Sequence, residues 1–538
     1  MTMFRNGIFT LLILFTTLVT YSQPTTWEWA MSTGGISYSE GYDVAADAAG
    51  NVYATGYYIN DTIQFGNFQL LNSGTADMYF VKFGPTGNVL FAFKIGQPGY
   101  EVGHGISLDG NGHVYITGSF TDSLLSIGTA TLTNYGKQDG FIAKYDTAGN
   151  FIWARNFGGV DDEEARAIDV DINGNSVVVG VFKSPMLNFG SLQVANPAPS
   201  TLNQYFIVRY DPSGNAIWGA ADGAAMGDFG NAAAIDNSGN SYIAGAIVPN
   251  SDLQLFVSKY SNTGTLLWTQ VATGTGSNRA YGMDIDHLGN VIVTGEFRGT
   301  TCTIGGQTLT NSGPSGLNQD LLLVKFDASG NVVWAKSEGE NLSGDIGKAV
   351  EVDQFGNIYL SGDFSTSTFN FGTSVLLNNG VSDVFIACYS SAGNVLWANS
   401  GGGPSQEIAH GIAIDGMGGV TSTGSNKLGT LHFGNIVINV PTGNSNVYVA
   451  QLNYLTGLHD VSSSDKLWSL FPNPTYGTVS LTGSNVISKI EVYDVTGKQI
   501  SSHYPNTLNF TFDIKEKGLL FLKVYDRENV SHFKVISN

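Results

Sequence analysis

The sequence predicts an all-β protein built from a repeated unit, and three observations carry that prediction. Glycine supplies 69 of 538 residues without a collagen period, which is typical of many tight turns between short strands. Each unit contains four short segments with period-two alternation, which in the sixth unit are AVEVD, NIYLSGDF, DVFIACYS and NVLWANS. No segment carries an apolar stripe with the 3.6-residue period of a helix.

Two sequence markers recur in phase along the chain. The first is an aspartate followed three residues later by glycine, and it occurs at Asp47, Asp109, Asp171, Asp236, Asp286, Asp353 and Asp415. The second is an aromatic residue 18 residues earlier, or 19 in one unit, and it occurs at Trp29, Phe91, Trp153, Trp218, Trp268, Trp334 and Trp397. A chain of this length must divide or repeat, because compact cores stop growing well below it. The markers indicate seven repeats.

Four strands per unit match a blade of a β-propeller, whose two faces are buried against neighbouring blades. The main alternative is an open solenoid. The segment TTWEWAMSTGG near the N-terminus copies the last strand of a unit, while the seventh unit lacks that strand after NVYVAQLNYLTG. A ring can use the N-terminal strand to complete its last blade, whereas a solenoid needs polar caps. The sequence therefore predicts a seven-bladed β-propeller closed by its N-terminal strand.

Two segments resemble the unit of the bacterial seven-bladed β-propeller repeat family. They are GISLDGNGHVYITGSF at 105–120 and KAVEVDQFGNIYLSGDF at 348–364, and the resemblance covers about Trp27 to Leu455. It implies the fold far more than a function, because propellers of one architecture host unrelated activities.

The N-terminus is predicted to be a signal peptide, residues 1–22. Arg5 precedes an apolar run from Gly7 to Val19, and small residues precede the expected cleavage after Ser22. The run is short for a membrane span and has no cysteine for lipid attachment, so we expect export without membrane insertion. The predicted domains are the propeller at 24–457, a linker at 458–466 and a small Ig-like β-sandwich at 467–538.

Charge and cysteine content exclude several classes of partner. Lys and Arg total 24 against 44 Asp and Glu, and the net charge of −20 repels nucleic acid and anionic lipid. Cys302 and Cys388 are far apart and lack CxxC spacing, so we expect two buried thiols and neither a disulfide framework nor a metal site. We expect no cofactor and a monomer.

New motifs replace the repeat near the C-terminus. They are FPNPTYGTVSL at 471–481, IEVYDVTGKQI at 490–500, and GLLFLKVYD followed by HFKVIS from 518. Their order and spacing resemble the type A sorting domain of type IX secretion cargo in Bacteroidetes-like bacteria; an ordinary Ig-like module is the alternative. The resemblance implies a surface or secreted location, recognition by the type IX secretion machinery, and a sorting motif at Pro472, Asn473, Pro474, Gly477, Tyr493, Asp494, Gly497, Lys498, Gly518 and Lys523.

No motif for catalysis or metal binding stands out. GxSxG, HExxH and a phosphate-binding glycine loop are missing from the sequence. The DVDINGN and DIDHLGN segments suggest calcium, but the twelfth position from Asp169, where an EF-hand needs an acidic residue, is Gly180. We therefore expect the repeated aspartates to cap their own turns.

The residue five positions before each repeated aspartate is polar or aromatic in every unit and varies among the units. It is expected to open the innermost strand and to face one mouth of the central channel, where polar and aromatic groups could bind a sugar-like ligand. Ordinary exposed surface is the alternative. These seven ring residues are Tyr42, His104, Arg166, Asn231, Tyr281, Lys348 and His410.

Two further features accompany the ring. In each unit, an acidic or amide residue three positions before the ring residue is predicted to cap the preceding loop. These residues are Glu101, Glu163, Asp228, Asn278, Asp345 and Glu407, and in the first unit Glu40 is displaced by one position. The fourth unit lacks the long loop between its middle strands, so that face is expected to have a notch.

These features favour a non-catalytic binding or adhesion module for an extracellular glycan or surface protein. A secreted carbohydrate-active enzyme, with ring histidines or tyrosines as acid or base, is the second hypothesis. A structural surface coat is the third.

Overall fold

The computed structural model describes most of the chain in two compact units, Gln23–Tyr454 and Leu455–Asn538. The described residues are 26–35, 38–59, 61–197, 202–223, 227–249, 251–313, 318–340, 344–416, 418–427, 429–440, 445–453, 468–471, 477–493, 498–516, 518–525 and 530–537. The predicted signal peptide (1–22) and linker (458–466) lie outside them. Every described regular element is a β-strand.

The described part of the larger unit contains seven four-stranded antiparallel sheets, numbered here in chain order of their first strands. Sheet 1 contains β2 (Tyr38–Ala46), β3 (Val52–Ile59), β6 (Ala76–Phe83) and β7 (Val89–Ile95). Sheet 2 contains β8 (Glu101–Leu108), β9 (His113–Phe120), β12 (Asp139–Asp146) and β13 (Phe151–Phe157). Sheet 3 contains β14 (Glu163–Val170), β15 (Ser176–Phe182), β18 (Gln204–Tyr210) and β19 (Ala216–Asp222). Sheet 4 contains β20 (Phe229–Ile235), β21 (Ser241–Ile247), β22 (Gln254–Tyr260) and β23 (Leu266–Val271). Sheet 5 contains β25 (Asn278–Ile285), β26 (Val291–Phe297), β29 (Asp320–Phe326) and β30 (Val332–Glu338). Sheet 6 contains β31 (Asp345–Val352), β32 (Ile358–Phe364), β35 (Asp383–Tyr389) and β36 (Val395–Gly401). Sheet 7 is β37 (Glu407–Ile414), β38 (Gly419–Asn426), β41 (Asn446–Asn453) and β1 (Thr26–Ser32).

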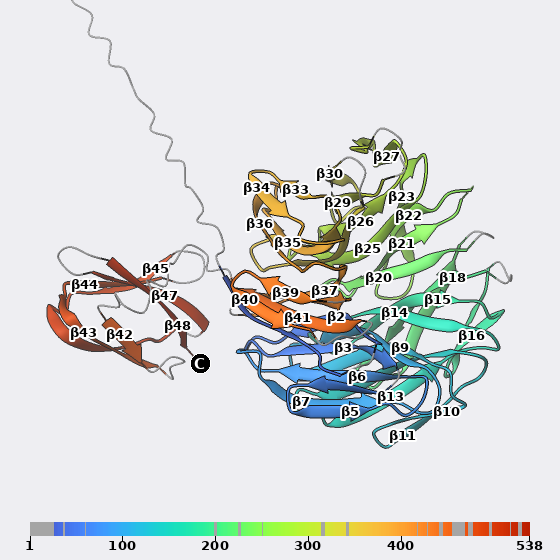
Figure 1. Ribbon diagram of the computed structural model, residues 1–538, viewed down its shortest axis with the longest axis horizontal. Helices are drawn as coiled ribbons and strands as arrows, with labels where there is room; N and C mark the ends of the chain where they lie inside the picture. The colour runs from blue at the N-terminus through green and yellow to red at the C-terminus, as the bar shows by residue number, and fades with distance from the viewer. Residues whose placement is uncertain are drawn as a thin grey trace, which may run out of the picture. The chain divides into compact units, whose positions relative to one another are not determined.

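Sheet 7 joins the two ends of the larger unit. β1 pairs antiparallel with β41, from Thr26 opposite Asn453 to Ser32 opposite Tyr448. The Trp29 indole donates a hydrogen bond of 2.8 Å to the Gln451 side chain. The first strands β37 and β2 also contact each other, so sheets 7 and 1 are neighbours, as Figure 1 shows for the orange and blue strands.

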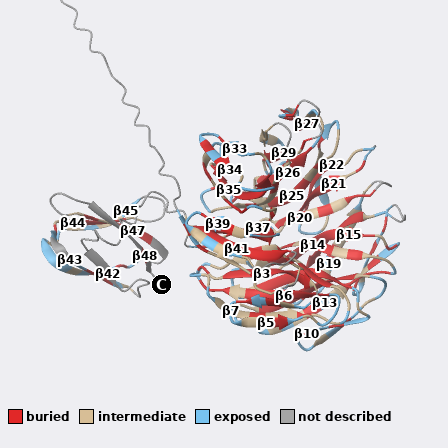
Figure 2. Ribbon diagram, in the orientation of Figure 1, coloured by how far each residue is buried: buried red, intermediate tan, exposed pale blue. Residues whose placement is uncertain are grey.

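Both faces of the second and third strands of each sheet in the larger unit are buried. On β6, Tyr79 and Phe80 point to opposite faces, as successive strand residues do, and both are fully buried. Figure 2 shows this burial along the strands of the larger unit, with exposed residues in the turns. Each such aromatic side chain contributes about 2 kcal/mol through burial of its apolar surface. Packing of sheets against one another therefore supplies the core of this unit.

Six of the seven sheets carry a small hairpin between their second and third strands. The hairpins are β4 (Thr62–Phe65) with β5 (Phe68–Leu71), β10 (Leu124–Ile127) with β11 (Ala130–Thr133), β16 (Met186–Phe189) with β17 (Leu192–Ala195), β27 (Thr301–Ile304) with β28 (Gln307–Thr310), β33 (Thr368–Phe371) with β34 (Ser374–Leu377), and β39 (Thr430–Phe433) with β40 (Ile436–Asn439). β24 (Thr273–Gly274) adds a third strand beside β27. The described residues of sheet 4 have no such hairpin, as the sequence predicts, and Leu266 on its outer strand is 48% exposed.

The repeated aspartates cap their own turns, as predicted. In sheet 3, Asp171 Oδ1 accepts the backbone N–H groups of Asn173 and Asn175 at 2.9 Å each, and corresponding bonds recur at Asp47, Asp109, Asp236, Asp286, Asp353 and Asp415. Gly174 takes a φ of +82°, which a residue with a side chain rarely adopts. The glycine of the marker is therefore required by the turn.

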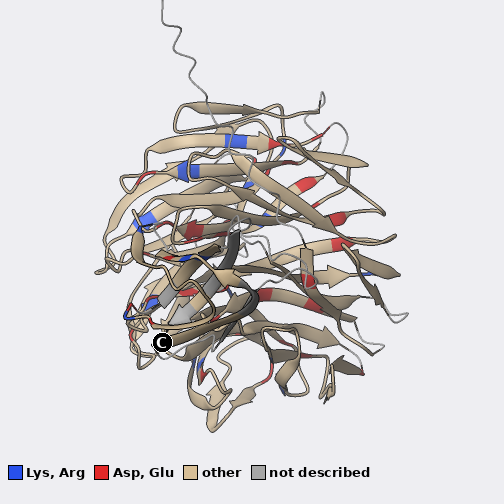
Figure 3. Ribbon diagram, turned by 90° about the vertical axis from the view of Figure 1, so that its left-hand side faces the viewer, with Lys and Arg blue, Asp and Glu red and all other residues tan. Residues whose placement is uncertain are grey.

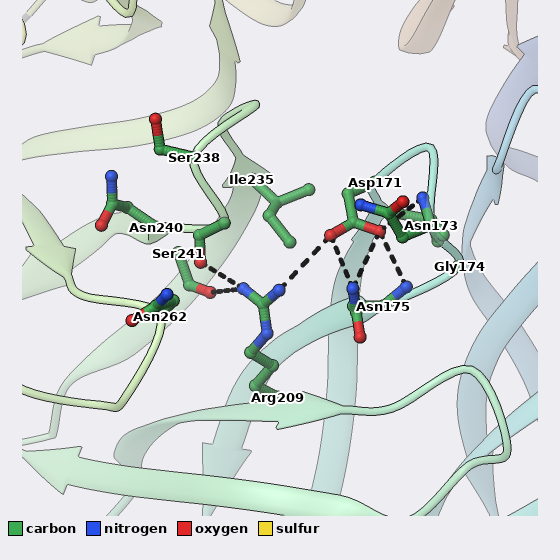
Figure 4. Close-up of polar contacts among 12 residues, drawn as sticks. Asp171, Asn173, Gly174, Asn175, Arg209, Ile235, Ser238, Asn240, Ser241 and Asn262 are labelled. Atoms are coloured by element: carbon green, nitrogen blue, oxygen red, sulfur yellow. Dashed lines mark hydrogen bonds and ion pairs between the residues drawn. The ribbon is translucent and has the colours of Figure 1, made fainter.

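A buried cation ties this turn to the next sheet. Arg209 on β18 lies 3.3 Å from the Asp171 carboxylate and also hydrogen-bonds to Gly239 O and Ser241 Oγ of sheet 4 (Figure 4). Both side chains of the ion pair are less than a tenth exposed. Lys325 pairs with Asp286 in the same way at 2.9 Å. Each ion pair lies within one sheet, and the cation reaches the next sheet through a further hydrogen bond, which for Lys325 is to Ser391 O of sheet 6 at 3.4 Å.

The described part of the smaller unit has two sheets. One contains β42 (Trp468–Phe471), β43 (Thr478–Ile487) and β46 (Thr507–Asp513); the other contains β44 (Lys489–Tyr493), β45 (Gln499–His503), β47 (Gly518–Tyr525) and β48 (Val530–Ser537). Ile490, Val492, Leu520, Leu522 and Val524 are all buried in one cluster. The Glu491 carboxylate between them accepts the hydroxyls of Tyr493 at 2.8 Å and Tyr525 at 2.6 Å.

In the described part of the chain, no helix could cross a membrane. Acidic positions outnumber basic ones, and Figure 3 marks both on the ribbon. Cys302 and Cys388 are buried and free, as predicted.

Candidate functional site

Each ring residue lies at a β-bulge in the first strand of its sheet. The register between first and second strands skips one residue in every sheet, and the skipped residue is Tyr42, His104, Arg166, Asn231, Tyr281, Lys348 or His410. A bulge leaves the extra residue unpaired and re-aims its side chain. The predicted place at the start of the strand was wrong, because each first strand begins and pairs two to four residues earlier. Period-two patterning does not reveal a bulge.

The seven bulged residues line one cavity of about 350 Å³. The first strands of all seven sheets contribute its wall. Neighbouring first strands contact each other around it, from β2 through β37 and back to β2. The structure therefore brings the ring residues together, although they are spread over 369 positions from Tyr42 to His410.

Aromatic residues dominate the side of the ring formed by sheets 7, 1 and 2. The imidazole of His104 stacks on the ring of Tyr42 with centroids 5.1 Å apart, and the His410 ring is nearly perpendicular to Tyr42 with centroids 5.3 Å apart. Tyr57 of β3 stacks on Tyr42 at 5.6 Å. Tyr42 thus contacts three other rings.

Charged residues continue the ring through sheets 3 and 4. The Glu164 carboxylate lies 3.5 Å from His104 Nε2 and 3.3 Å from Arg166 Nε. Arg166 also donates to the Asn231 side-chain oxygen at 3.0 Å, and Asn231 donates to Ala280 O at 2.9 Å. Each of these side chains orients the next along the ring.

Sheets 5 and 6 complete the ring. The Lys348 ammonium lies over the Tyr281 ring at 4.8 Å, and the Tyr281 hydroxyl donates to Glu296 at 3.0 Å. Burial, followed by the Glu296 charge, raises the pKa of Tyr281 to about 12. Its hydroxyl therefore stays protonated at neutral pH.

The two ring histidines are neutral at physiological pH. Burial, and then the nearby Lys348 charge, lowers the pKa of His410 to about 3. Burial also lowers the pKa of His104, against the opposing Glu164 charge. His410 Nε2 has no hydrogen-bond partner among the described residues. A neutral imidazole can donate or accept a hydrogen bond but does not supply a positive charge.

Four carboxyl groups that the ring prediction missed also line the cavity: Asp43, Asp169, Asp284 and Glu351. Each accepts a backbone N–H from the first strand of the next sheet in the chain. Asp43, for example, accepts Ile106 N at 2.9 Å. The sequence signal was an acidic residue shortly after the ring residue, three positions later for Asp169, Asp284 and Glu351 and one position later for Asp43.

Burial shifts the titration of these four groups. It raises the pKa of Asp43 and Asp284 to about 7 and that of Asp169 to about 6, in each case against backbone hydrogen bonds that lower it. The pKa of Glu351 is raised well above its ordinary value, first by burial and then by the Asp284 charge. The cavity thus holds weakly acidic carboxyl groups. In the part of the chain that the structure describes, no group of three or more His, Cys, Asp or Glu side chains is placed to hold a metal ion.

The predicted loop caps are found in the structure. Glu101, Glu163 and Glu407 each accept a backbone N–H of the preceding loop at 2.8 Å, and Asp345 accepts one at 3.1 Å. Asp228 instead accepts Val248 N, and Asn278 donates to Gln254. Glu40 does not join this set, because Ser39 occupies the equivalent position and the Glu40 carboxylate accepts the Tyr38 hydroxyl.

Five of the ten sorting-motif residues are described. Lys523 Nζ lies over the Tyr493 ring at 5.2 Å, Gly477 takes a φ of +119°, Gly518 begins β47, and Lys498 directly precedes β45. Pro472, Asn473, Pro474, Asp494 and Gly497 lie outside the described residues.

The smaller unit matches a known family. Residues 469–538 match the secretion system C-terminal sorting domain. For a longer stretch, the chain is 23% identical over 457 residues to an uncharacterized WD repeat-containing protein of Acanthamoeba polyphaga mimivirus, covering 74% of this chain and 31% of that protein. It is 22% identical over 379 residues to the regulatory protein FlaEY of Caulobacter vibrioides, covering 65% and 39%. The chain spans only about a third of the length of these curated relatives.

Solved structures align with most of the chain at low identity. Sqt1 from Chaetomium thermophilum aligns with 81% of this chain and all of its own at 8% identity and a TM-score of 0.40. PorZ, a surface component of the type-IX secretion system of Porphyromonas gingivalis, aligns with 95% of this chain and all of its own at 10% identity and a TM-score of 0.19. The described regular elements of the chain are all β-strands, and its C-terminal sorting domain directs export by the type IX secretion system to the cell surface or beyond.

Proposed function

We propose that the larger unit is a seven-bladed β-propeller of the bacterial repeat type, spanning residues 24–457. Each four-stranded sheet is a blade, and β1 completes the last blade. The pairing of β1 with β41 and the contact of β37 with β2 support this closure. Residues 1–22 are a signal peptide, 458–466 a linker, and 467–538 an Ig-like sandwich.

The protein is a binding or adhesion module that acts outside the cell as a monomer. After handling by the type IX machinery, it presents the cavity mouth to an extracellular glycan or surface protein. The observation that carries this proposal is the convergence of seven polar or aromatic bulged residues on one cavity. Pockets with a few converging polar groups on a rigid scaffold are the usual form of a ligand site.

A glycan array probed with the purified full chain tests this proposal. A variant with Arg166→Ala and Lys348→Ala removes two ring side chains that contact other ring residues. A variant with Lys137→Ala and Arg155→Ala, two exposed cations outside the cavity, serves as a charge-matched control. We expect glycan binding by the wild type and the control and weaker binding by the ring variant. Equal binding by all three proteins would contradict a site at this mouth.

Turnover is a second candidate function, and the raised pKa values of Asp43 and Asp284 favour it, because general acids often have such values. Both carboxyl groups are engaged by backbone N–H groups, which favours a structural role instead. Release of shorter products from any glycan bound on the array would identify an enzyme. If a bound glycan released no shorter products, the function of the protein would be binding without turnover.

A further inference from the structure

Four tyrosines form a cluster beside the aromatic side of the ring. Tyr57 is its centre, with ring centroids 6.3 Å from Tyr38, 5.6 Å from Tyr42 and 5.8 Å from Tyr100. Tyr42 lines the cavity, and Tyr57 is only 8% exposed. Tyr38 and Tyr100 are half-buried. The tyrosine cluster therefore leads from the cavity wall to the partly exposed rings of Tyr38 and Tyr100.

The cluster departs from the repeat. Tyr38 and Tyr100 both stand four residues before a ring residue, where the other sheets have Asp162, Gly227, Ser277, Gly344 and Gln406. Tyr57 follows the glycine of a second strand, where the other sheets have Ser119, Val181, Ala246, Glu296, Asp363 and Ser425. None of these eleven residues is aromatic, so the fold does not require aromatic side chains there. Two neighbouring sheets have nevertheless acquired three phenol rings at one place.

The Glu40 carboxylate lies among the phenol groups. Tyr38 donates its hydroxyl to Glu40, and the Glu40 charge is the second cause, after burial, that raises the pKa of both Tyr42 and Tyr57. The phenols consequently remain protonated and can both donate and accept hydrogen bonds. Glu40, which is partly exposed, keeps acceptor capacity for further hydroxyl donors.

The packing of the rings distinguishes two ligand chemistries. An aromatic cage for a quaternary ammonium surrounds a void with open ring faces. Here Tyr57 covers Tyr42 on one side with planes 26° apart, and His104 stacks on it with planes 22° apart. Contiguous rings with neighbouring hydroxyl and carboxylate groups instead suit the flat apolar face and the hydroxyl groups of a pyranose.

We propose that Tyr38, Tyr57, Tyr100 and Glu40 form a subsite for a neutral hexose unit of a glycan chain. The sugar ring packs on Tyr38 and Tyr100, and its hydroxyls bond to Glu40 and to the phenol groups. This inference rests on the proposed binding function and assigns its ligand class and one place of contact.

The test uses the full chain and isothermal titration with cellohexaose, laminarihexaose and mannohexaose, alongside choline chloride and a galacturonic acid oligomer. The test variant combines Tyr38→Ser with Tyr100→Ser. The matched control is Tyr135→Ser, an exposed tyrosine of the same unit outside the cavity. Thermal unfolding verifies that each variant is folded, and Glu40→Gln provides a milder second variant that keeps the shape of the side chain.

We expect one of the neutral hexose oligomers to bind, with affinity reduced roughly tenfold or more in the double variant, because the sugar loses two stacking contacts; tenfold corresponds to about 1.4 kcal/mol in the free energy of binding. Glu40→Gln should weaken the same oligomer, and Tyr135→Ser should leave it unchanged. Unchanged affinity in the folded double variant would overturn the subsite. The subsite would also be overturned if the wild type bound only choline or the acidic oligomer, or bound none of the probes. Loss of binding in the Arg166 and Lys348 variant but not in the tyrosine variant would overturn the subsite while supporting the proposed function.

Discussion

The imidazole of His104 stacks on the phenol ring of Tyr42, with centroids 5.1 Å apart and planes 22° from parallel. The two residues are 62 positions apart and belong to neighbouring sheets. Because His410 makes a T-shaped contact with the same ring, Tyr42 links three sheets at one point. The ring around the cavity is thus also a set of contacts between sheets.

Replacement of Tyr42 should therefore destabilise the larger unit. Tyr42→Ala removes contacts with Tyr57, His104 and His410, and we expect a loss of about 2 kcal/mol or more in the free energy of unfolding. Tyr42→Phe keeps the ring and should cost much less. Urea unfolding of both variants measures the difference. Equal costs would contradict the stacking role and point to the hydroxyl.

The cavity carboxyl groups should make the protein less stable as pH rises. Asp43, Asp169 and Asp284 have folded pKa values of about 7, 6 and 7, above an unfolded value of about 3.9. The folded state therefore binds more protons between about pH 4 and pH 7, so the free energy of unfolding falls across that window. Glu491, whose pKa is lowered to about 2 first by Lys489, changes stability only below that window.

The melting temperature should accordingly be higher at pH 5 than at pH 8. The variants Asp43→Asn and Asp284→Asn cannot lose a proton, so each should reduce that difference. A melting temperature that rises from pH 5 to pH 8 in the wild type would contradict the shifted carboxyl groups.

His410 should not titrate near neutral pH. Burial and the Lys348 charge favour its neutral imidazole and lower the pKa of His410 to about 3, far below the ordinary value. We expect its ring proton chemical shifts to stay constant from pH 5 to pH 8 in NMR spectra. The spectrum of His410→Gln assigns the resonance by its disappearance. A midpoint above pH 6 would refute this prediction.

Removal of Asp171 should cost more than removal of an aspartate in a similar turn. Asp171→Ala breaks the turn bonds and leaves Arg209 buried without its carboxylate partner, at a cost of about 3 kcal/mol. Asp146 makes equivalent bonds to Ala148 and Asn150 in a more exposed turn, and Asp146→Ala should cost about 1 kcal/mol. Chemical denaturation compares them. Similar losses would show that the Arg209 pair contributes little.

Replacement of a large side chain by alanine should reduce the free energy of unfolding less on the outer strand of sheet 4 than on the outer strand of sheet 5. Val332 is packed against the hairpin turn at Gly305, whereas Leu266 lacks such a cover and is 48% exposed. We expect Leu266→Ala to change stability by less than about 0.5 kcal/mol and Val332→Ala to cost about 1 kcal/mol or more. A larger loss for Leu266→Ala would indicate that another part of the chain covers it.

The sequence alone determined the elements that depend on neighbouring residues. Alternation and the Asp-x-x-Gly marker predicted the strands and their turns, because an aspartate side chain and a positive φ at glycine satisfy a turn locally. The shortened loop of the fourth unit and the buried cysteines also followed from the sequence. The three C-terminal motifs indicated the sorting domain.

Only the tertiary structure decided what the ring position does. A bulge at Tyr42 depends on the register of β2 against β3, and its stacking on His104 depends on a neighbouring sheet, so neither leaves a period in the sequence. The same holds for Asp43, whose carboxylate bonds to Ile106 N across a sheet boundary. The tyrosine cluster likewise joins residues of β2, β3 and the loop before β8. Contacts between sheets arise when the repeats pack side by side, and local sequence cannot encode which side chains then meet.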